Sequence, residues 1–366
     1  MRKLSMLLWF ATKKSLCFNK NLLPILTILC FSSFKTTALN YYWIGGSGNW
    51  SNLSHWATTS GGTILHSQIP TALDDVFFDN NSFSTAGQVV NFDAPTTLVH
   101  SINWTGTSGS PLMSGSNLIK IYGSLTFIPG LDITNLTGEI NFESTSPGQT
   151  ITMAGQHFNG TVNFNGIGGG WAFQDEFTTN YPMYLNAGAL NFNDQQVNAS
   201  AFYSSVTTTR SLNMGSSVFN ISGSSNSCWI VKSPGLTLNC GTSVINFNNS
   251  AFASDMQGDN SGNLIFYDVN FTATSTTGLG GMSGIFGSHK FHHVSFHSPG
   301  RIMNSNTFNE LTFDKDGELH ANNSFNKLTF SPAYTYLLWN GTTQTDRKST
   351  RLNSSHGGIS RMPSSA

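Results

Sequence analysis

The chain has 366 residues, of which 28 are Phe and 36 are Gly, with 17 Lys and Arg against 18 Asp and Glu. Six basic residues precede residue 40, four follow residue 345, and Asp346 is the one acidic residue outside these bounds, so residues 40–345 carry seven basic and seventeen acidic residues, a net charge of −10. This acidic body excludes recognition of a nucleic-acid backbone, which needs Lys and Arg to displace counterions, and the many Phe residues exclude a disordered chain.

The first 39 residues have the order of a secretory signal peptide. Basic residues between Arg2 and Lys20 precede a short apolar run at 22–31, and small residues follow, with Thr36 and Ala38 at the spacing that suits signal peptidase. The apolar run is shorter than the roughly 20 residues that span a bilayer, so a membrane anchor is the weaker alternative. We therefore expect residues 1–39 to direct export.

Residues 40–95 are rich in large aromatic side chains, with Trp43, Trp50 and Trp56 around the glycine-rich stretch 45–48. A stack of strands needs a terminal cap that covers its apolar end and blunts its free edge. The region is therefore predicted to be an N-terminal capping region. Because exposed tryptophan rings also stack on sugars, Trp43, Trp50 and Trp56 are the candidate carbohydrate-binding residues, with packing inside the cap as the alternative.

From residue 96 to residue 345, short segments such as 118–122 and 161–165 alternate apolar and polar residues, and Gly, Asn and Ser separate them. A period of two residues is typical of half-buried β-strands. No segment has sustained helical periodicity. The composition and the pattern together predict an all-β protein.

Internal repetition is the strongest signal. The hexapeptides FHHVSF, FNELTF and FNKLTF begin at Phe291, Phe308 and Phe325, an offset of 17 residues each time, and a related segment begins at Phe266. Further upstream, Phe recurs every 22 to 28 residues, at positions 142, 164, 192, 219 and 247. A constant strand with variable spacing between its copies is typical of a solenoid, in which loops absorb the differences in length.

These repeats predict a parallel β-helix (β-solenoid) over residues 96–345. Successive coils would lie roughly 4.8 Å apart, with Val294, Leu311 and Leu328 stacked in one interior column. Parallel crossovers favour a right-handed coil. A string of small antiparallel sandwiches is the competing interpretation, because their strands recur at similar spacing.

The last segment, 346–366, differs in composition from the rest: four of its residues are Lys or Arg and it has no Phe. It resembles the translation of a sequencing adapter and is expected not to be natural protein. The solenoid would then be truncated near residue 345.

Four histidines cluster at positions 289, 292, 293 and 297. Along an extended strand His293 and His297 are about 13 Å apart, too far to share one zinc ion, so the cluster does not predict a metal site. Stacking instead places His293 over Glu310 and then Lys327, and His297 over Asp314. The expected result is a solvated ladder of charges.

Asp74, Asp75 and Asp79 precede or follow an apolar strand. Paired carboxylates can bind Ca²⁺, but adjacent residues in a strand point to opposite faces, which favours turn and capping roles. Cys228 and Cys240 could form a disulfide in an oxidising compartment or remain two free thiols. The sequence has no nucleophile elbow, no metalloprotease motif and no zinc-type Cys/His spacing, so we expect no catalytic residue, no metal and no cofactor.

Two long motifs and several repeats have a familiar form: YYWIGGSGNWSNLSHWATTSGG, IPTALDDVFFDNNSF, FNGIGGGWAFQDEF, TTTRSLNMGSSVFNISGS and SNTFNELTF. Over residues 41–345 the chain resembles large repetitive proteins that bacteria export to their surface. The resemblance implies a secreted or outer-surface protein with a β-helical stalk. It also implies a C-terminal sorting domain, missing here, as the contact with an outer-membrane export machinery.

The expected function is that of a non-catalytic structural or adhesion protein that contacts extracellular polysaccharide or another surface. The alternative is a β-helical polysaccharide lyase or hydrolase, which would need carboxylates with Lys or Arg on one outer face. An ice-binding solenoid would need repeated Thr columns, and only Thr312 and Thr329 are expected to stack.

Overall fold

The computed structural model describes residues 37–223, 227–249, 253–272, 281–332 and 334–346. These residues form 36 β-strands and one short 3-10 helix, η1 (Leu53–His55). All neighbouring strands in the sheets run parallel, except for one antiparallel pair at the N-terminal end. The all-β, parallel β-solenoid fold is therefore confirmed. The predicted segments 1–39 and 346–366 lie outside the described residues, apart from 37–39 and Asp346.

The strands form four sheets, which we name A to D. Sheet A contains β1 (Asn40–Trp43), β3 (Trp56–Ala57), β4 (Asp75–Phe77), β7 (Ile102–Asn103), β10 (Leu125–Thr126), β13 (Gln149–Thr152), β16 (Gly170–Phe173), β19 (Gly188–Asn191), β22 (Arg210–Asn213) and β25 (Leu236–Asn239). Sheet B contains β2 (Gly48–Asn49), β5 (Val89–Asn91), β8 (Leu112–Gly115) and β11 (Asp132–Leu136).

The other two sheets reach the last coils of the described chain. Sheet C contains β6 (Thr96–Val99), β9 (Leu118–Ile121), β12 (Ile140–Phe142), β15 (Val162–Phe164), β18 (Pro182–Leu185), β21 (Ala201–Ser204), β24 (Trp229–Val231), β27 (Asp255–Gln257), β29 (Ser283–Phe286), β31 (Gly300–Ile302), β33 (Gly317–Leu319) and β35 (Tyr336–Leu338). Sheet D contains β14 (His157–Phe158), β17 (Phe177–Thr179), β20 (Gln196–Ala199), β23 (Val218–Ile221), β26 (Val244–Phe247), β28 (Ile265–Phe271), β30 (Lys290–Phe296), β32 (Thr307–Phe313), β34 (Asn323–Phe330) and β36 (Gln344–Asp346).

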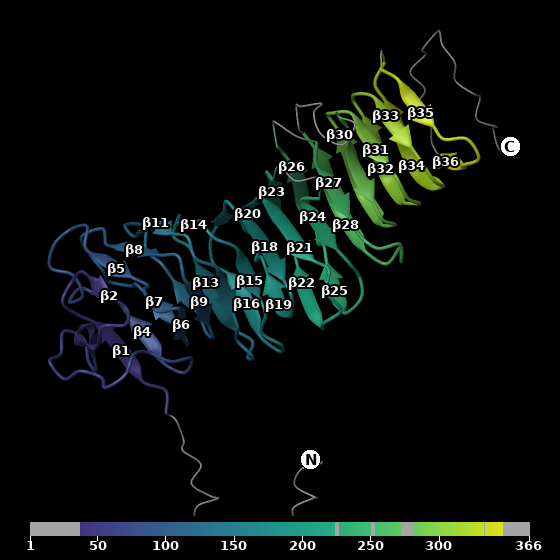
Figure 1. Cartoon of the computed structure of the whole chain (residues 1–366). Coiled ribbons are helices and arrows are strands. Elements are labelled where there is room, and N and C mark those ends of the chain that lie inside the picture. The colour runs from purple at the N-terminus through teal and green to yellow at the C-terminus, as the bar shows by residue number, and fades with distance from the viewer. Residues whose placement is uncertain (1–36, 224–226, 250–252, 273–280, 333, 347–366) are drawn as a thin grey trace, which may run out of the picture. The chain divides into compact units, whose positions relative to one another are not determined.

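From β4 to β27 each coil contributes one strand to each of three sides. The coil of β7, β8 and β9 adds in turn to sheets A, B and C, whereas the coil of β22, β23 and β24 adds to sheets A, D and C. On this side of the coils sheet B ends at β11 and sheet D begins at β14, and these two strands are in contact. Figure 1 shows the strands of successive coils side by side along the chain.

The coils contract after β27. No described strand adds to sheet A beyond β25. At the same point the strands of sheet D lengthen, from four residues in β26 to seven in β28, β30 and β32. These later coils have two strands, and the 17-residue offset seen in the sequence is the length of one such coil.

The interior column predicted from the repeats is confirmed. Val294, Leu311 and Leu328 are neighbours in register in β30, β32 and β34, and each is at most 5% exposed. The same column continues upstream through Val197, Phe219, Ile245 and Val269. Fully burying one such side chain contributes about 1.5–3 kcal/mol, which a single coil could not gain without its neighbours.

Stacked phenylalanine rings form the column beside it. The ring of Phe296 lies between those of Phe271 and Phe313, with centroids 4.5 and 4.9 Å away. The upstream Phe residues do not form one such column, although their spacing suggested a single repeat. They are divided among three sheets: Phe142 and Phe164 lie in sheet C, Phe192 directly follows β19 of sheet A, and Phe219 and Phe247 occupy two different columns of sheet D.

Residues 40–95 contain both the end of the stack and its first coil strands. β3 pairs antiparallel with β1 and so ends sheet A on the N-terminal side, which removes a free parallel edge. β4 and β5 already pair in parallel with β7 and β8. The stacked region therefore begins before the boundary at residue 96 that the sequence suggested.

Candidate functional site

The three tryptophans proposed to contact sugar are all buried. Trp43, Trp50 and Trp56 have no exposed surface, and the ring of Trp56 packs edge-on against the other two, with centroids 4.9 and 4.7 Å away. The indole N–H of Trp43 donates to the Gly46 carbonyl at 2.7 Å. Because no ring face is accessible, the structure contradicts the sugar-stacking role and supports packing inside the cap.

An exposed tryptophan lies elsewhere. Trp339 follows β35, the last strand of sheet C, and is 50% exposed, whereas every other described tryptophan is buried. Its ring packs on that of His320, with centroids 4.3 Å apart. Trp339 was not predicted as exposed, because a lone aromatic residue near the end of the repeats carries no burial signal in the sequence.

The acidic cluster has turn and capping roles, as the alternation of the strand predicted. Asp74 is buried and accepts hydrogen bonds from the backbone of Leu39 and Thr71 at 2.9 Å each. Asp75 points elsewhere and pairs with His100 at 2.7 Å. The Asp79 carboxylate accepts from the backbone of Asn81 at 2.9 Å, so the three carboxylates have separate partners. Among the residues that the structure describes, no group of three or more His, Cys, Asp or Glu side chains could hold a metal ion.

The charged ladder on sheet D is confirmed. His293, Glu310 and Lys327 are neighbours in register in three successive coils. The Lys327 ammonium donates to the Glu310 carboxylate, and this hydrogen bond holds the pKa of Glu310 below its ordinary value. His297 pairs with Asp314 at 2.6 Å. These side chains are partly or fully exposed, so each pair contributes little to stability.

A longer column of amide and hydroxyl side chains lies beside that ladder, and we call it the polar column. Its members, in chain order, are Thr178, Asn198, Asn220, Asn246, Asn270, Ser295, Thr312 and Thr329. Asn220, Asn246 and Asn270 each donate through Nδ2 to the Oδ1 atom of the asparagine one coil upstream, at 2.9, 3.1 and 3.0 Å. Most members are half-buried, so the column is part of the outer surface of sheet D.

The polar column was not recognised from the sequence, although a signal exists. In four consecutive strands of sheet D an asparagine stands between two apolar residues, as VNA, FNI, INF and VNF. Sheet A has a shorter ladder of the same kind, in which Asn213 donates to Asn191 at 2.9 Å and Asn239 donates to Asn213 at 2.8 Å. Such amide ladders satisfy the side chains without adding charge.

A buried polar group lies where the coils contract. Asp255 in β27 and Arg301 in β31 face each other across Gly284, with a closest N–O distance of 3.8 Å. Burial raises the pKa of Asp255 to about 7, against the opposing effect of Arg301. The side chain is only 2% exposed, so a polymeric substrate has no access to this carboxylate.

Cys228 and Cys240 are not joined by a disulfide, and the Cys228 thiol donates to the Gly223 carbonyl at 3.3 Å. Cys228 is buried, and burial also raises the pKa of the partly exposed Cys240.

The chain was compared with protein families, curated proteins and solved structures, and none of the three comparisons gave a match. Within the described ranges, no helix is long and apolar enough to cross a membrane.

Proposed function

We propose that this chain is a non-catalytic structural and adhesive protein, secreted or displayed on the outer cell surface, whose sheet D contacts extracellular polysaccharide. The observation that carries the proposal is the polar column. It holds eight successive amide or hydroxyl side chains in register, one from each coil from β17 to β34. Ser295 and the hydroxyl oxygen of Thr329 are buried, and the other six side chains are partly exposed. Amides and hydroxyls are the groups that exchange hydrogen bonds with sugar hydroxyls, and a repeated array allows many weak contacts to act together.

The charge of the body narrows the class of polysaccharide. Residues 40–345 carry a net charge of −10. An acidic surface repels acidic polymers over a distance set by the ionic strength. We therefore expect a neutral glycan to bind better than an acidic one such as alginate, with the difference largest at low salt.

The alternative, a polysaccharide lyase or hydrolase, requires an accessible carboxylate beside a basic group. The one described carboxyl with a pKa raised toward neutrality is Asp255, and it is buried. The seven basic residues of the body are also dispersed along the chain, five of them in five different strands. Adhesion through an outer face accounts better for these features.

The test uses the full chain with an insoluble neutral glucan and, separately, with alginate and pectin. Bound protein is measured by depletion from solution, and soluble sugar by reducing ends and unsaturated products. Binding of the glucan without release of sugar is expected. Release of unsaturated oligosaccharides would instead establish the lyase.

Two matched double variants locate the surface. Changing Asn220 and Asn246 to Ala shortens the polar column, and changing Asn191 and Asn213 to Ala removes comparable amide bonds from sheet A. The loss of about two hydrogen bonds at the contact corresponds to roughly tenfold weaker binding. This loss is expected for the sheet D variant alone. Equal loss in both variants would contradict a role for sheet D.

A further inference from the structure

Sheet A ends with an open edge in the middle of the chain. Its last strand, β25, pairs in the described structure with β22 alone, because the coil that follows β27 begins with β28, which pairs with β26 in sheet D. The carbonyls of Gly235 and Asn239 accept from the amides of Arg210 and Met214, at 2.8 Å each. Backbone groups alternate along a strand, so both backbone groups of Leu238 point away from β22 toward the open edge.

The interior of the solenoid is incomplete at the same place. Leu190 and Leu212 stand above Leu238 in register and are at most 1% exposed. Leu238, below which no described residue adds a strand, is only partly buried, and so is Leu236. Ile265, on the facing segment, is 52% exposed. The apolar column is therefore buried at Leu190 and Leu212 but partly accessible at its last member, Leu238.

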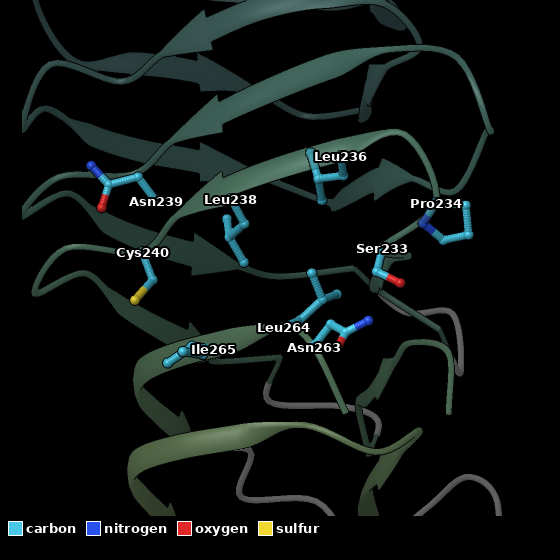
Figure 2. Close-up of a pocket in the computed structure, with 9 residues that line it drawn as sticks. All are labelled: Ser233, Pro234, Leu236, Leu238, Asn239, Cys240, Asn263, Leu264 and Ile265. Carbon is cyan, nitrogen blue, oxygen red and sulfur yellow. The ribbon is translucent and has the colours of Figure 1, made fainter. Parts of the chain in front are cut away.

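A cavity of about 570 Å³ separates β25 from residues 263–265. Figure 2 shows Leu236 and Leu238 on one side of the gap, with Leu264 and Ile265 on the other. This volume is in the range of pockets that bind ligands. No lining residue is charged. Because burying an unpaired charge is costly, the cavity favours an uncharged occupant.

We propose that this open edge binds an extended, uncharged peptide segment of another polypeptide, which adds to sheet A as a parallel strand beside β25. A peptide is the occupant whose backbone can pair with the free groups of Leu238, in the manner of strand addition to a sheet edge. The side chains already stacked in sheet A indicate which residues the peptide should carry. An apolar residue would continue the column that ends at Leu238, and an amide would continue the asparagine ladder that ends at Asn239. The inference does not rest on the proposed polysaccharide contact.

The probe is an uncharged synthetic peptide with blocked termini that copies residues 186–193 of this chain, NAGALNFN. It places Leu190 and Asn191 at the register of Leu238 and Asn239. In the native fold the Ala189 amide donates to the strand above, at 2.9 Å to Gly169, and the Phe192 amide donates to the strand below, at 3.0 Å to Asn213. The amides of Ala189 and Asn191 would therefore face β25 in the docked peptide, and those of Leu190 and Phe192 would face away.

Binding of the labelled peptide to the full chain is measured by fluorescence anisotropy. Saturable binding of one peptide per chain is expected. N-methylation of Ala189 and Asn191 removes two facing donors and should weaken binding about tenfold or more. N-methylation of Leu190 and Phe192 should leave the affinity within about twofold. Absence of saturable binding, or equal loss for both methylated peptides, would overturn the proposal.

A pair of protein variants places the peptide in the cavity. Ile265→Glu introduces a charge on the cavity wall, and Ile167→Glu, at a position 69% exposed and outside the cavity, is the matched control. Both positions are exposed, so both variants should fold. The first should weaken binding about tenfold or more and the second should leave it unchanged. Insensitivity to Ile265→Glu, or self-association of the chain through this edge in sedimentation experiments, would instead contradict a peptide from another protein.

Discussion

Asp255 and His289 are buried residues whose shifted pKa values link stability to pH in opposite directions. The ordinary pKa of Asp255 is 3.8, and burial raises the pKa to about 7 in the folded protein, although Arg301 opposes the rise. Between about pH 4 and pH 7 the unfolded chain has therefore lost a proton that the folded protein keeps. The Asp255 contribution to stability should fall as the pH rises through this window, by about 1.4 kcal/mol for each unit of pKa difference. Burial lowers the pKa of His289 from 6.5 to about 4, so the His289 contribution rises with pH between these values and opposes that of Asp255.

Asp255→Asn removes the contribution of Asp255, because an amide does not titrate. Measured from about pH 4 to pH 7, the urea unfolding midpoint should decline more, or rise less, in the parent chain than in the variant, because only the parent chain carries the Asp255 contribution while both keep the opposing one of His289. The comparison is of slopes, so any constant change in stability caused by the amide cancels. Identical slopes in the two proteins would show that Asp255 is already ionised in the fold.

For single residues, the sequence predicted the partners of the sheet D histidines correctly but not the burial of the N-terminal tryptophans. The partners of His293 and His297 followed from the fixed offset of 17 residues, because that offset gives register directly. The burial of Trp43, Trp50 and Trp56 did not follow. Aromatic side chains suit both an apolar interior and a sugar-binding surface, and only the folding of β1, η1 and β3 onto one another decides between them.

At the scale of the strand, the polar column should contribute measurably to the cohesion of neighbouring coils. Asn246 donates to Asn220 at 3.1 Å and accepts from Asn270 at 3.0 Å. Asn246→Ala breaks both bonds and should lower the free energy of unfolding by about 1–3 kcal/mol. The exposed pair formed by Asn326 and Asn309 has a single bond of 3.0 Å, so Asn326→Ala should cost less than about 0.5 kcal/mol.

Chemical denaturation of the two variants checks this difference. Comparable losses at Asn246 and Asn326 would mean that water replaces the amide bonds of the column without cost. A loss confined to Asn246 would show that half-burial makes these hydrogen bonds harder to replace.

The spacing of Phe residues in the sequence predicts which of them stack only where the coils have a constant length. Where coils have a constant length, equal spacing in the sequence means the same column in space, as with Phe291, Phe308 and Phe325. In the three-sided coils, loops of different length separate the strands, and an apolar residue can face the interior from any side. The spacing of Phe164 and Phe192 therefore resembles a repeat, although the two residues belong to different sheets.

For the whole molecule, the pairing of each strand only with its counterparts in adjacent coils has an energetic consequence. Apart from the antiparallel pair at the cap, sheets A to D connect coils in chain order, and no described pairing joins distant coils. Stability in such a stack approximates a sum of terms for each coil and each interface between neighbours. A defect in one coil should therefore remain local.

Two core variants of the same chemistry test this locality. Leu311→Ala in β32 and Leu185→Ala in β18 each remove a fully buried leucine and should each cost about 2–5 kcal/mol. Amide hydrogen exchange should rise for Leu311→Ala in β30, β32 and β34, the strand and its two neighbours. For Leu185→Ala the rise should move to β15, β18 and β21. If either variant accelerates exchange evenly from β4 to β34, the stack unfolds as one cooperative unit and the nearest-neighbour description fails.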